Sequence, residues 1–148
     1  MTLWFTSDTH FSHVNVINHC NRPIPGIGEM SKSEKSHAMN KWLTEKWNER
    51  IKPNDTVYHL GDFAFTGKTN RLGIIQKLNG IKHLIRGNHD DDKKEWWLIN
   101  GFESVHDLYH FMVHDKDTDG KQFHQGIVLC HYPLLSWNHM HHGWWHFH

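Results

Sequence analysis

The chain has 148 residues, the usual size of one domain, and no apolar run in it approaches the ~18 residues that a membrane span needs. Its 16 basic and 16 acidic side chains cancel, so the charge balance gives no indication of a membrane surface or of nucleic acid as a partner. Because the first residues also lack the features of a signal peptide, we expect one soluble domain over residues 1–148 that resides in the cytoplasm.

The chain begins with a predicted strand and a short helix. The β-branched and aromatic side chains of residues 2–6 predict a buried strand, and the polar segment 7–10 then forms the loop at its carboxyl end. Ser12 is placed to cap a short helix that includes Val14 and Ile17. Proline and glycine residues after this helix predict a loop before the next element.

A long amphipathic helix is predicted next. Ser31 and Glu34 have the spacing of a capping box, in which each residue bonds to the backbone N–H of the other. Apolar residues then recur at helical intervals, namely Met39, Trp42, Leu43, Trp47 and Ile51. The Pro-Asn-Asp segment at residues 53–55 is expected to end the helix.

Two further strands complete the N-terminal half. Residues 56–60 and 81–86 have the composition of buried strands, and a helical segment over 72–78, stopped by Gly80, lies between them. Each of the three strands ends in a short polar cluster, with a helical segment before the next strand. This pattern predicts βαβ organisation, in which binding sites form outside the carboxyl ends of the strands.

The second half of the chain has a different pattern. Residues 109–114 and 121–133 are strand-like stretches joined by a turn, and residues 144–148 resemble one more strand. No repeat or linker divides the chain, so the two halves are expected to form a single domain.

The polar clusters at the strand ends contain groups that bind metals. They present Asp8, His10, Asp62, Asn88, His89 and His131, which is a mixed oxygen and nitrogen set suited to Mn, Fe or Zn. Asp8 and His10 are two residues apart, so in an extended segment their side chains would point the same way and hold one ion together. The two cysteines, Cys20 and Cys130, favour reduced thiols over a disulfide.

These blocks occur in a recognisable order. The sequence reads SDTH at 7–10, LGDF at 60–63, RGNHD at 86–90 and CHYP at 130–133. This order of motifs resembles that of the calcineurin-like metallophosphoesterase superfamily, and the sequence around the motifs resembles the compact phage and bacterial branch of that family. The resemblance implies an α/β fold: a β-sandwich flanked by helices, with βαβ units in the N-terminal half.

The resemblance also implies roles for individual residues. Asp8 and His10 would bind a first divalent ion, Asn88 and His131 a second, and Asp62 would bridge both. Mn²⁺ is the expected ion, with Fe, Zn and Ni as alternatives, and the substrate would be a small phosphate monoester or diester. His89 would protonate the leaving group in hydrolysis or stabilise charge at phosphorus, and Asp90 would either orient His89 or serve only as a turn residue.

Each of these residues also has an ordinary structural explanation. An aspartate after a strand is most often a cap or turn former, and the segment 87–90 on its own could be a turn with Asn88 in a left-handed conformation. His131 could be a hydrogen-bonded core histidine. His59 is expected to neighbour Asp62.

The end of the chain leaves several alternatives open. In the family, a Gly-His-x-His block would follow His148, so we expect a domain that is incomplete at its C-terminus, unless His146 and His148 replace that block. A family member that keeps the fold but binds metal weakly, with little catalysis, is the alternative to an active enzyme. A nucleic-acid-binding role is the least favoured, and it would use the cations Arg71, Lys82, Arg86, Lys93 and Lys94.

Overall fold

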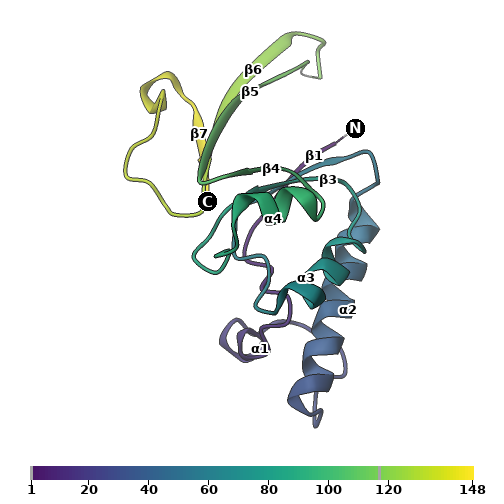
Figure 1. Ribbon diagram of the computed structural model, residues 1–148. Helices are drawn as coiled ribbons and strands as arrows, with labels where there is room; N and C mark the ends of the chain where they lie inside the picture. The colour runs from purple at the N-terminus through teal and green to yellow at the C-terminus, as the bar shows by residue number, and fades with distance from the viewer. Residues whose placement is uncertain (1, 117) are drawn as a thin grey trace.

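The computed structural model describes residues 2–116 and 118–148, which form two β-sheets and four α-helices (Figure 1). The strands are β1 (Leu3–Thr6), β2 (Thr56–His59), β3 (Ile81–Ile85), β4 (Phe102–His106), β5 (Leu108–Lys116), β6 (Gln122–Cys130) and β7 (Trp145–Phe147). The helices are α1 (Asn15–His19), α2 (Lys32–Arg50), α3 (Lys68–Ile75) and α4 (Lys94–Ile99), with a 3₁₀ turn at Met140–His142. Among the described residues, no helix combines the length and the apolar character needed to cross a membrane.

The first sheet is parallel and its strand order follows the chain. β1 pairs with β2, β2 with β3 and β3 with β4, so the carboxyl ends of all four strands meet at one edge. The second sheet has the order β5-β6-β7, in which β5 and β6 are antiparallel and β7 runs parallel to β6. The predicted α/β sandwich flanked by helices, with βαβ units in the N-terminal half, is therefore confirmed.

The first sheet is covered on both faces, and successive side chains along its strands enter different cores. Val57 and Leu84 belong to the core shared with the helices, whereas Tyr58 and Ile85 belong to the core shared with the second sheet. A strand buried on both faces reads as a nearly continuous apolar run, which is why residues 56–60 and 81–86 were recognisable.

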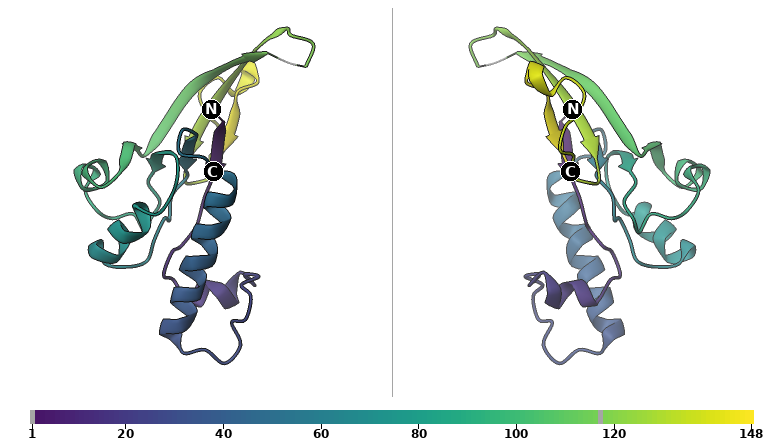
Figure 2. Two further views of the ribbon diagram at one scale, coloured as in Figure 1. Left: turned by 90° about the vertical axis from the view of Figure 1, so that its right-hand side faces the viewer. Right: turned by 90° about the vertical axis from the view of Figure 1, so that its left-hand side faces the viewer.

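The helical side is held by a few specific bonds. The capping box is present: Glu34 N donates to Ser31 Oγ, and Ser31 N donates to the Glu34 carboxylate at 2.8 Å. The indole N–H of Trp47 donates to the Asn79 carbonyl at 2.9 Å and fixes α2 against the segment that leads into β3. Figure 2 shows α2 extending away from the sheets, with the β5–β6 hairpin at the opposite end of the molecule.

Aromatic rings fill the space between the two sheets. Tyr58 stacks on His83 with ring centroids 4.6 Å apart and on Phe111 at 5.0 Å, and Phe5 meets Phe147 edge-on at 4.8 Å. Burial between the sheets raises the pKa of Tyr58 to about 12. Apolar contact thus sets how β5–β7 dock on the parallel sheet.

Three local predictions need correction. Helix α1 begins at Asn15 with no side-chain cap, because Ser12 bonds to Asn40 of α2 instead: Ser12 N donates at 2.7 Å and Ser12 Oγ accepts at 2.8 Å. The helix expected over 72–78 spans Lys68–Ile75. A third difference is that neither α4 nor β4 was predicted from the sequence.

Candidate metal centre

Two loops at the carboxyl edge of the parallel sheet run side by side beyond the strands. Asp8 N donates to Gly61 O, His10 N to Asp62 O, and Phe11 N to Phe63 O, each at 3.0 Å. These bonds continue the pairing of β1 with β2 past the ends of both strands. The loops after β1 and β2 therefore carry Asp8, His10 and Asp62 next to one another.

The backbone of these loops is left-handed at all three residues. The φ angles are 52° at Asp8, 47° at His10 and 54° at Asp62. The expectation that Asp8 and His10 meet because their segment is extended is thus wrong, although the two side chains do come together. Left-handed backbone costs about 1–2 kcal/mol for a residue with a side chain, and such strain tends to collect at functional sites.

Asp62 lies at the middle of the cluster. Its Oδ2 is 3.5 Å from His10 Nε2, and its Oδ1 is 3.7 Å from His131 Nε2. His10 Nε2 is also 3.5 Å from Asp8 Oδ1. Only 4% of Asp62 is exposed, so this carboxylate is held between imidazoles from two sides of the site with little access to water.

The sixth β-strand delivers His131 to the same place. His131 Nδ1 lies 2.8 Å from the Leu60 carbonyl, which can only accept, so Nδ1 carries a proton and Nε2 faces the site. His131 Nε2 is 3.3 Å from Asn88 Oδ1, in the loop after β3. Donor atoms of Asp8, Asp62 and His131 all lie within 4.8 Å of one another.

The donor set fits divalent cations. Carboxylate oxygens, imidazole nitrogens and one amide oxygen suit Mn, Fe or Zn, and two carboxylates converge at one point where a cation would offset their repulsion. Asp8, His10, Asp62, Asn88 and His131 are the residues that could hold metal. The structure brings all five together, and their individual ligand roles stay predictions.

Glycine is required where the two loops touch. A Cβ on Gly61, whose φ is +100°, would lie 2.5 Å from Gly87 N and 2.6 Å from His131 Nδ1. A Cβ on Gly87 would collide with the side chain of Asp62. The glycines that precede Asp62 and Asn88 therefore allow the loops after β2 and β3 to approach closely enough for their polar groups to share one site.

The Asp90 side chain links the loop after β2 to the loop after β3. Its carboxylate accepts hydrogen bonds from the backbone N–H groups of Asp62 at 2.8 Å, Phe63 at 3.1 Å and Gly87 at 2.9 Å. Burial raises the pKa of Asp90, and the three N–H donors partly offset that rise. The bond to Gly87 closes a turn, as one of the two sequence interpretations expects, and all three of these hydrogen bonds come from backbone N–H groups, while an orienting role toward His89 stays a prediction.

Two residues that support the loops were not assigned this role from sequence. The Arg22 guanidinium donates to the Thr9 carbonyl at 2.6 Å and to the Asp8 carbonyl at 2.7 Å. His59 Nδ1 accepts from Gly61 N at 3.2 Å, while its Nε2 is 2.8 Å from Thr9 Oγ1. His59 therefore links the two loops, and burial lowers its pKa to about 3, so the ring is neutral.

His89 stands on the open side of the site. Its backbone N–H donates to Asp62 Oδ1 at 3.0 Å, and its Nε2 is 3.9 Å from Asp62 Oδ2. The half-exposed Phe65 meets the His89 ring edge-on with centroids 5.4 Å apart, and its ring also lies 4.7 Å from His13. A cavity of about 310 Å³ opens beside His89 and is lined by Ala64, Phe65, Thr66, Arg71, Asn88, His89 and Asp91.

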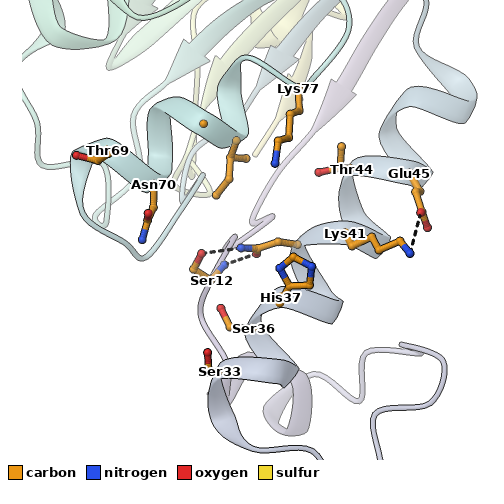
Figure 3. Close-up of a pocket in the computed structure, with 13 residues that line it drawn as sticks. Ser12, Ser33, Ser36, His37, Lys41, Thr44, Glu45, Thr69, Asn70 and Lys77 are labelled. Atoms are coloured by element: carbon orange, nitrogen blue, oxygen red, sulfur yellow. Dashed lines mark hydrogen bonds and ion pairs between the residues drawn. The ribbon is translucent and has the colours of Figure 1, made fainter.

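A larger cavity of about 700 Å³ is a separate feature between α2 and α3 (Figure 3). Most of its lining residues are polar, and they include Lys41, which pairs with Glu45, and Ser12, which bonds to Asn40. None of the predicted site residues lines this cavity.

Two sequence alternatives can be compared with the structure. His146 Nδ1 is 3.2 Å from the Val128 carbonyl and its Nε2 accepts from Leu134 N, also at 3.2 Å, so these contacts occupy both ring nitrogens. Four of the five cations proposed for a nucleic-acid rim are likewise engaged with protein groups: Arg71 with Asp92, Lys82 with the Leu78 and Gly80 carbonyls, and Arg86 and Lys94 with Asp107.

The family model for calcineurin-like phosphoesterases matches residues 1–146 of this chain. Among curated proteins, the uncharacterized protein MJ1445 of Methanocaldococcus jannaschii is 34% identical over 147 residues, covering 90% of this chain and 75% of that protein. The gene 66 proteins of Mycobacterium phages L5 and D29 are 29% and 33% identical, each covering 90% of this chain, with 64% and 65% of their own length matched.

One solved structure is also similar. It is the crystal structure of the protein of unknown function AQ665 from Aquifex aeolicus, with a TM-score of 0.52 and 34% sequence identity over 88% of this chain. This chain matches 60% of that protein and between 64% and 75% of the curated relatives. The phage relatives agree with the compact phage and bacterial branch inferred from the sequence blocks.

Proposed function

Because the chain belongs to the calcineurin-like phosphoesterase family, we propose that it hydrolyses small phosphate monoesters or diesters with two divalent metal ions, most suitably Mn²⁺. The observation that carries this proposal is the position of Asp62. Its two oxygens face imidazoles on opposite sides, His10 at 3.5 Å and His131 at 3.7 Å. A carboxylate in that position can serve two cations at once and reduce the repulsion between them.

The residues divide into two ligand groups around Asp62. Asp8 and His10 would hold one ion, and Asn88 and His131 the other. Bound divalent ions supply positive charge to phosphoryl oxygens and lower the pKa of a water molecule that attacks phosphorus. The Leu60 carbonyl keeps the His131 proton on Nδ1, and the Arg22 guanidinium fixes the loop that carries Asp8.

His89 is suited to the proton transfer. Its backbone is anchored to Asp62 Oδ1, its side chain is 37% exposed, and its Nε2 is available to hold a proton for the departing oxygen. The cavity beside it has room for the leaving group, and Phe65 offers an apolar surface there. We assign His89 as the general acid, and Asp90 as a residue that positions the loops on which it stands.

The alternative is a family member that binds metal weakly and has little activity. In its favour, within the part of the chain that the structure describes, one group of carboxylate and imidazole donors converges within 4.8 Å, and it has three members, Asp8, Asp62 and His131. Three protein ligands can still support a catalytic ion, so weak metal binding does not by itself mean that the protein lacks catalysis.

The test compares the intact protein with Asp62→Asn after removal of bound metal. Hydrolysis of p-nitrophenyl phosphate and of bis(p-nitrophenyl) phosphate is measured as Mn²⁺ is added back, and metal content is determined for each protein. We expect Mn²⁺-dependent turnover in the intact protein and loss of two-ion occupancy in Asp62→Asn. Glu45→Gln, on the exposed face of α2, makes the same change in charge and should behave like the intact protein.

Activity that survives chelation, or an Asp62→Asn protein with normal metal content and rate, would refute the proposal. Stoichiometric metal binding without hydrolysis of either ester would instead support the weakly active alternative.

A further inference from the structure

Two histidines face each other on the second sheet, outside the centre described above. His114 of β5 and His124 of β6 are direct partners in the antiparallel register. Their Nδ1 atoms lie 2.7 Å apart, and their ring centroids are 4.8 Å apart with the planes at 71°. Both residues are exposed.

The alternation of β5 places this pair on the outer face of the sheet. Tyr109, Phe111 and Val113 pack into the core between the two sheets, so His110 and His114 point to the other side. The same outer face carries Gly126 of β6, which is covered by the ring of Trp144. The pair is therefore open to solvent and is held by strands whose register is fixed by apolar contacts on the inner face.

A separation of 2.7 Å between two imidazole nitrogens has two physical explanations. The rings can share one proton, or both nitrogens can donate lone pairs to one cation. With metal–nitrogen bonds of about 2.0 Å, neighbouring donors lie about 2.8 Å apart in a square-planar site and about 3.3 Å apart in a tetrahedral one. The observed separation matches the square-planar value, which Cu²⁺ and Ni²⁺ prefer.

We propose that His114 and His124 form a surface chelate site for Cu²⁺ or Ni²⁺. The site has two imidazole nitrogen donors and no carboxylate between them, which sets it apart from the oxygen-rich centre around Asp62 and disfavours Mn²⁺. Water completes the coordination. The paired strands hold the two residues opposite each other before the ion binds, so less conformational entropy is lost on binding than for two residues on a flexible segment.

The experiment uses the full chain without an added histidine tag. Ni²⁺ binding is measured by titration calorimetry after metal removal, on the intact protein, His124→Asn and His114→Asn. The second imidazole binds intramolecularly, so loss of either ring should weaken this site roughly 10²-fold. Cu²⁺ electron paramagnetic resonance provides a second measurement, since the spectrum of the intact protein should contain two equatorial nitrogens that each variant reduces to one.

His110→Asn is the matched control. It removes an exposed histidine from the same face of β5, but its partner across the strands is Val128 rather than another histidine. We expect this variant to keep the Ni²⁺ site, and all variants to keep the circular dichroism spectrum and the Mn²⁺-dependent hydrolysis of the intact protein.

Several results would overturn the proposal. If His124→Asn and His110→Asn bind Ni²⁺ as the intact protein does, the two rings share a proton and no metal site exists there. Equal weakening by His110→Asn and His124→Asn would place the ion elsewhere on the histidine-rich surface. If His114→Asn fails to fold, His124→Asn alone decides, because its ring can be removed without altering β5.

Discussion

The parallel sheet and the second sheet are ordered by different forces. Around β1, β2 and β3 the loops are held by hydrogen bonds: Asp90 accepts from three backbone N–H groups, Arg22 donates to the Asp8 carbonyl, and His59 accepts from Gly61 N. The β5–β7 sheet instead docks through aromatic and aliphatic contact around Tyr58 and Ile127, and contributes only His131 to the centre. Hydrogen bonds thus set the shape of the loops around the site, whereas apolar packing holds the sheet from which His131 reaches it.

The largest effect should follow from cutting the polar network at Asp90. In Asp90→Ala three backbone N–H groups lose their acceptor, two of them buried and one partly buried, and each buried group costs about 1–3 kcal/mol, so the loops that carry Asp62 and Asn88 can separate. We expect Mn²⁺-dependent kcat/KM to fall roughly 10³-fold and urea-induced unfolding to occur at lower concentration.

Asp115→Ala, on the exposed surface of β5, serves as the control for general loss of a carboxylate. Normal kinetics in Asp90→Ala would show that apolar packing alone holds the loops, which would contradict the contrast drawn between the two regions.

A cavity in the apolar core between the two sheets should lower the stability of the protein without changing the metal centre. Ile127→Ala removes a buried side chain from the core between the sheets, at a cost of about 3 kcal/mol. Below its unfolding temperature the variant should keep kcat and Mn²⁺ affinity close to those of the intact protein, as measured by calorimetry and steady-state kinetics. If kcat instead falls by the same factor as the equilibrium constant for folding, the docking of the two sheets and the chemistry of the site cannot be separated.

His89→Ala separates proton transfer from metal binding. The residue lies on the open side, and its backbone bond to Asp62 is retained in the variant, so metal content should be unchanged. Turnover of an ester with a poor leaving group should fall roughly 10²-fold, while an ester with a good leaving group should be affected less. An equal loss for both kinds of ester would argue against His89 as the proton donor.

The lowered pKa of His59 sets the direction in which stability should change with pH. Burial lowers its folded pKa to about 3, well below the unfolded value of 6.5, so between these limits only the unfolded chain binds the proton. The free energy of unfolding should therefore decrease by about 1.4 kcal/mol per pH unit as pH falls from 6.5 towards 3. His59→Gln should remove this contribution from unfolding curves recorded at pH 7, 6, 5 and 4, and an unchanged slope would assign it to other histidines.

The smallest effect is expected at Ser12. Ser12→Ala loses one side-chain hydrogen bond to Asn40, worth about 1 kcal/mol, and leaves α1 intact because that helix has no side-chain cap. In a double-mutant cycle with Asn40→Ala, the coupling energy should be close to the effect of Ser12→Ala, because Asn40→Ala alone also removes the acceptor of Ser12 N. Additive effects would mean that the bond contributes nothing to stability.

The arrangement of the centre could be predicted from sequence wherever a polar residue directly follows a buried strand. Asp62 and Asn88 were located in this way, because parallel strands bring their carboxyl ends to one edge. The conformation of Asp8 and His10 could not be predicted, since left-handed backbone depends on bonds to the neighbouring loop rather than on local sequence.

Other features depend on partners far apart in the chain. Arg22 and Thr9 are 13 residues apart, and His59 and Thr9 are 50 residues apart, so no local pattern indicates these bonds. Helix α4 has six residues, too few for a helical period to be visible, and its position is fixed by the fully buried Trp97.

The bond between His59 and Thr9 makes the site observable without any label. His59 Nδ1 accepts a hydrogen bond, so the ring proton lies on Nε2, where it is shielded from solvent and donated to Thr9 Oγ1. Such a proton should exchange slowly and give a resolved signal at the low-field end of the proton NMR spectrum. Because it spans the loops after β1 and β2 without being a proposed ligand, its shift on addition of diamagnetic Zn²⁺ would report how far those loops move when the centre is filled.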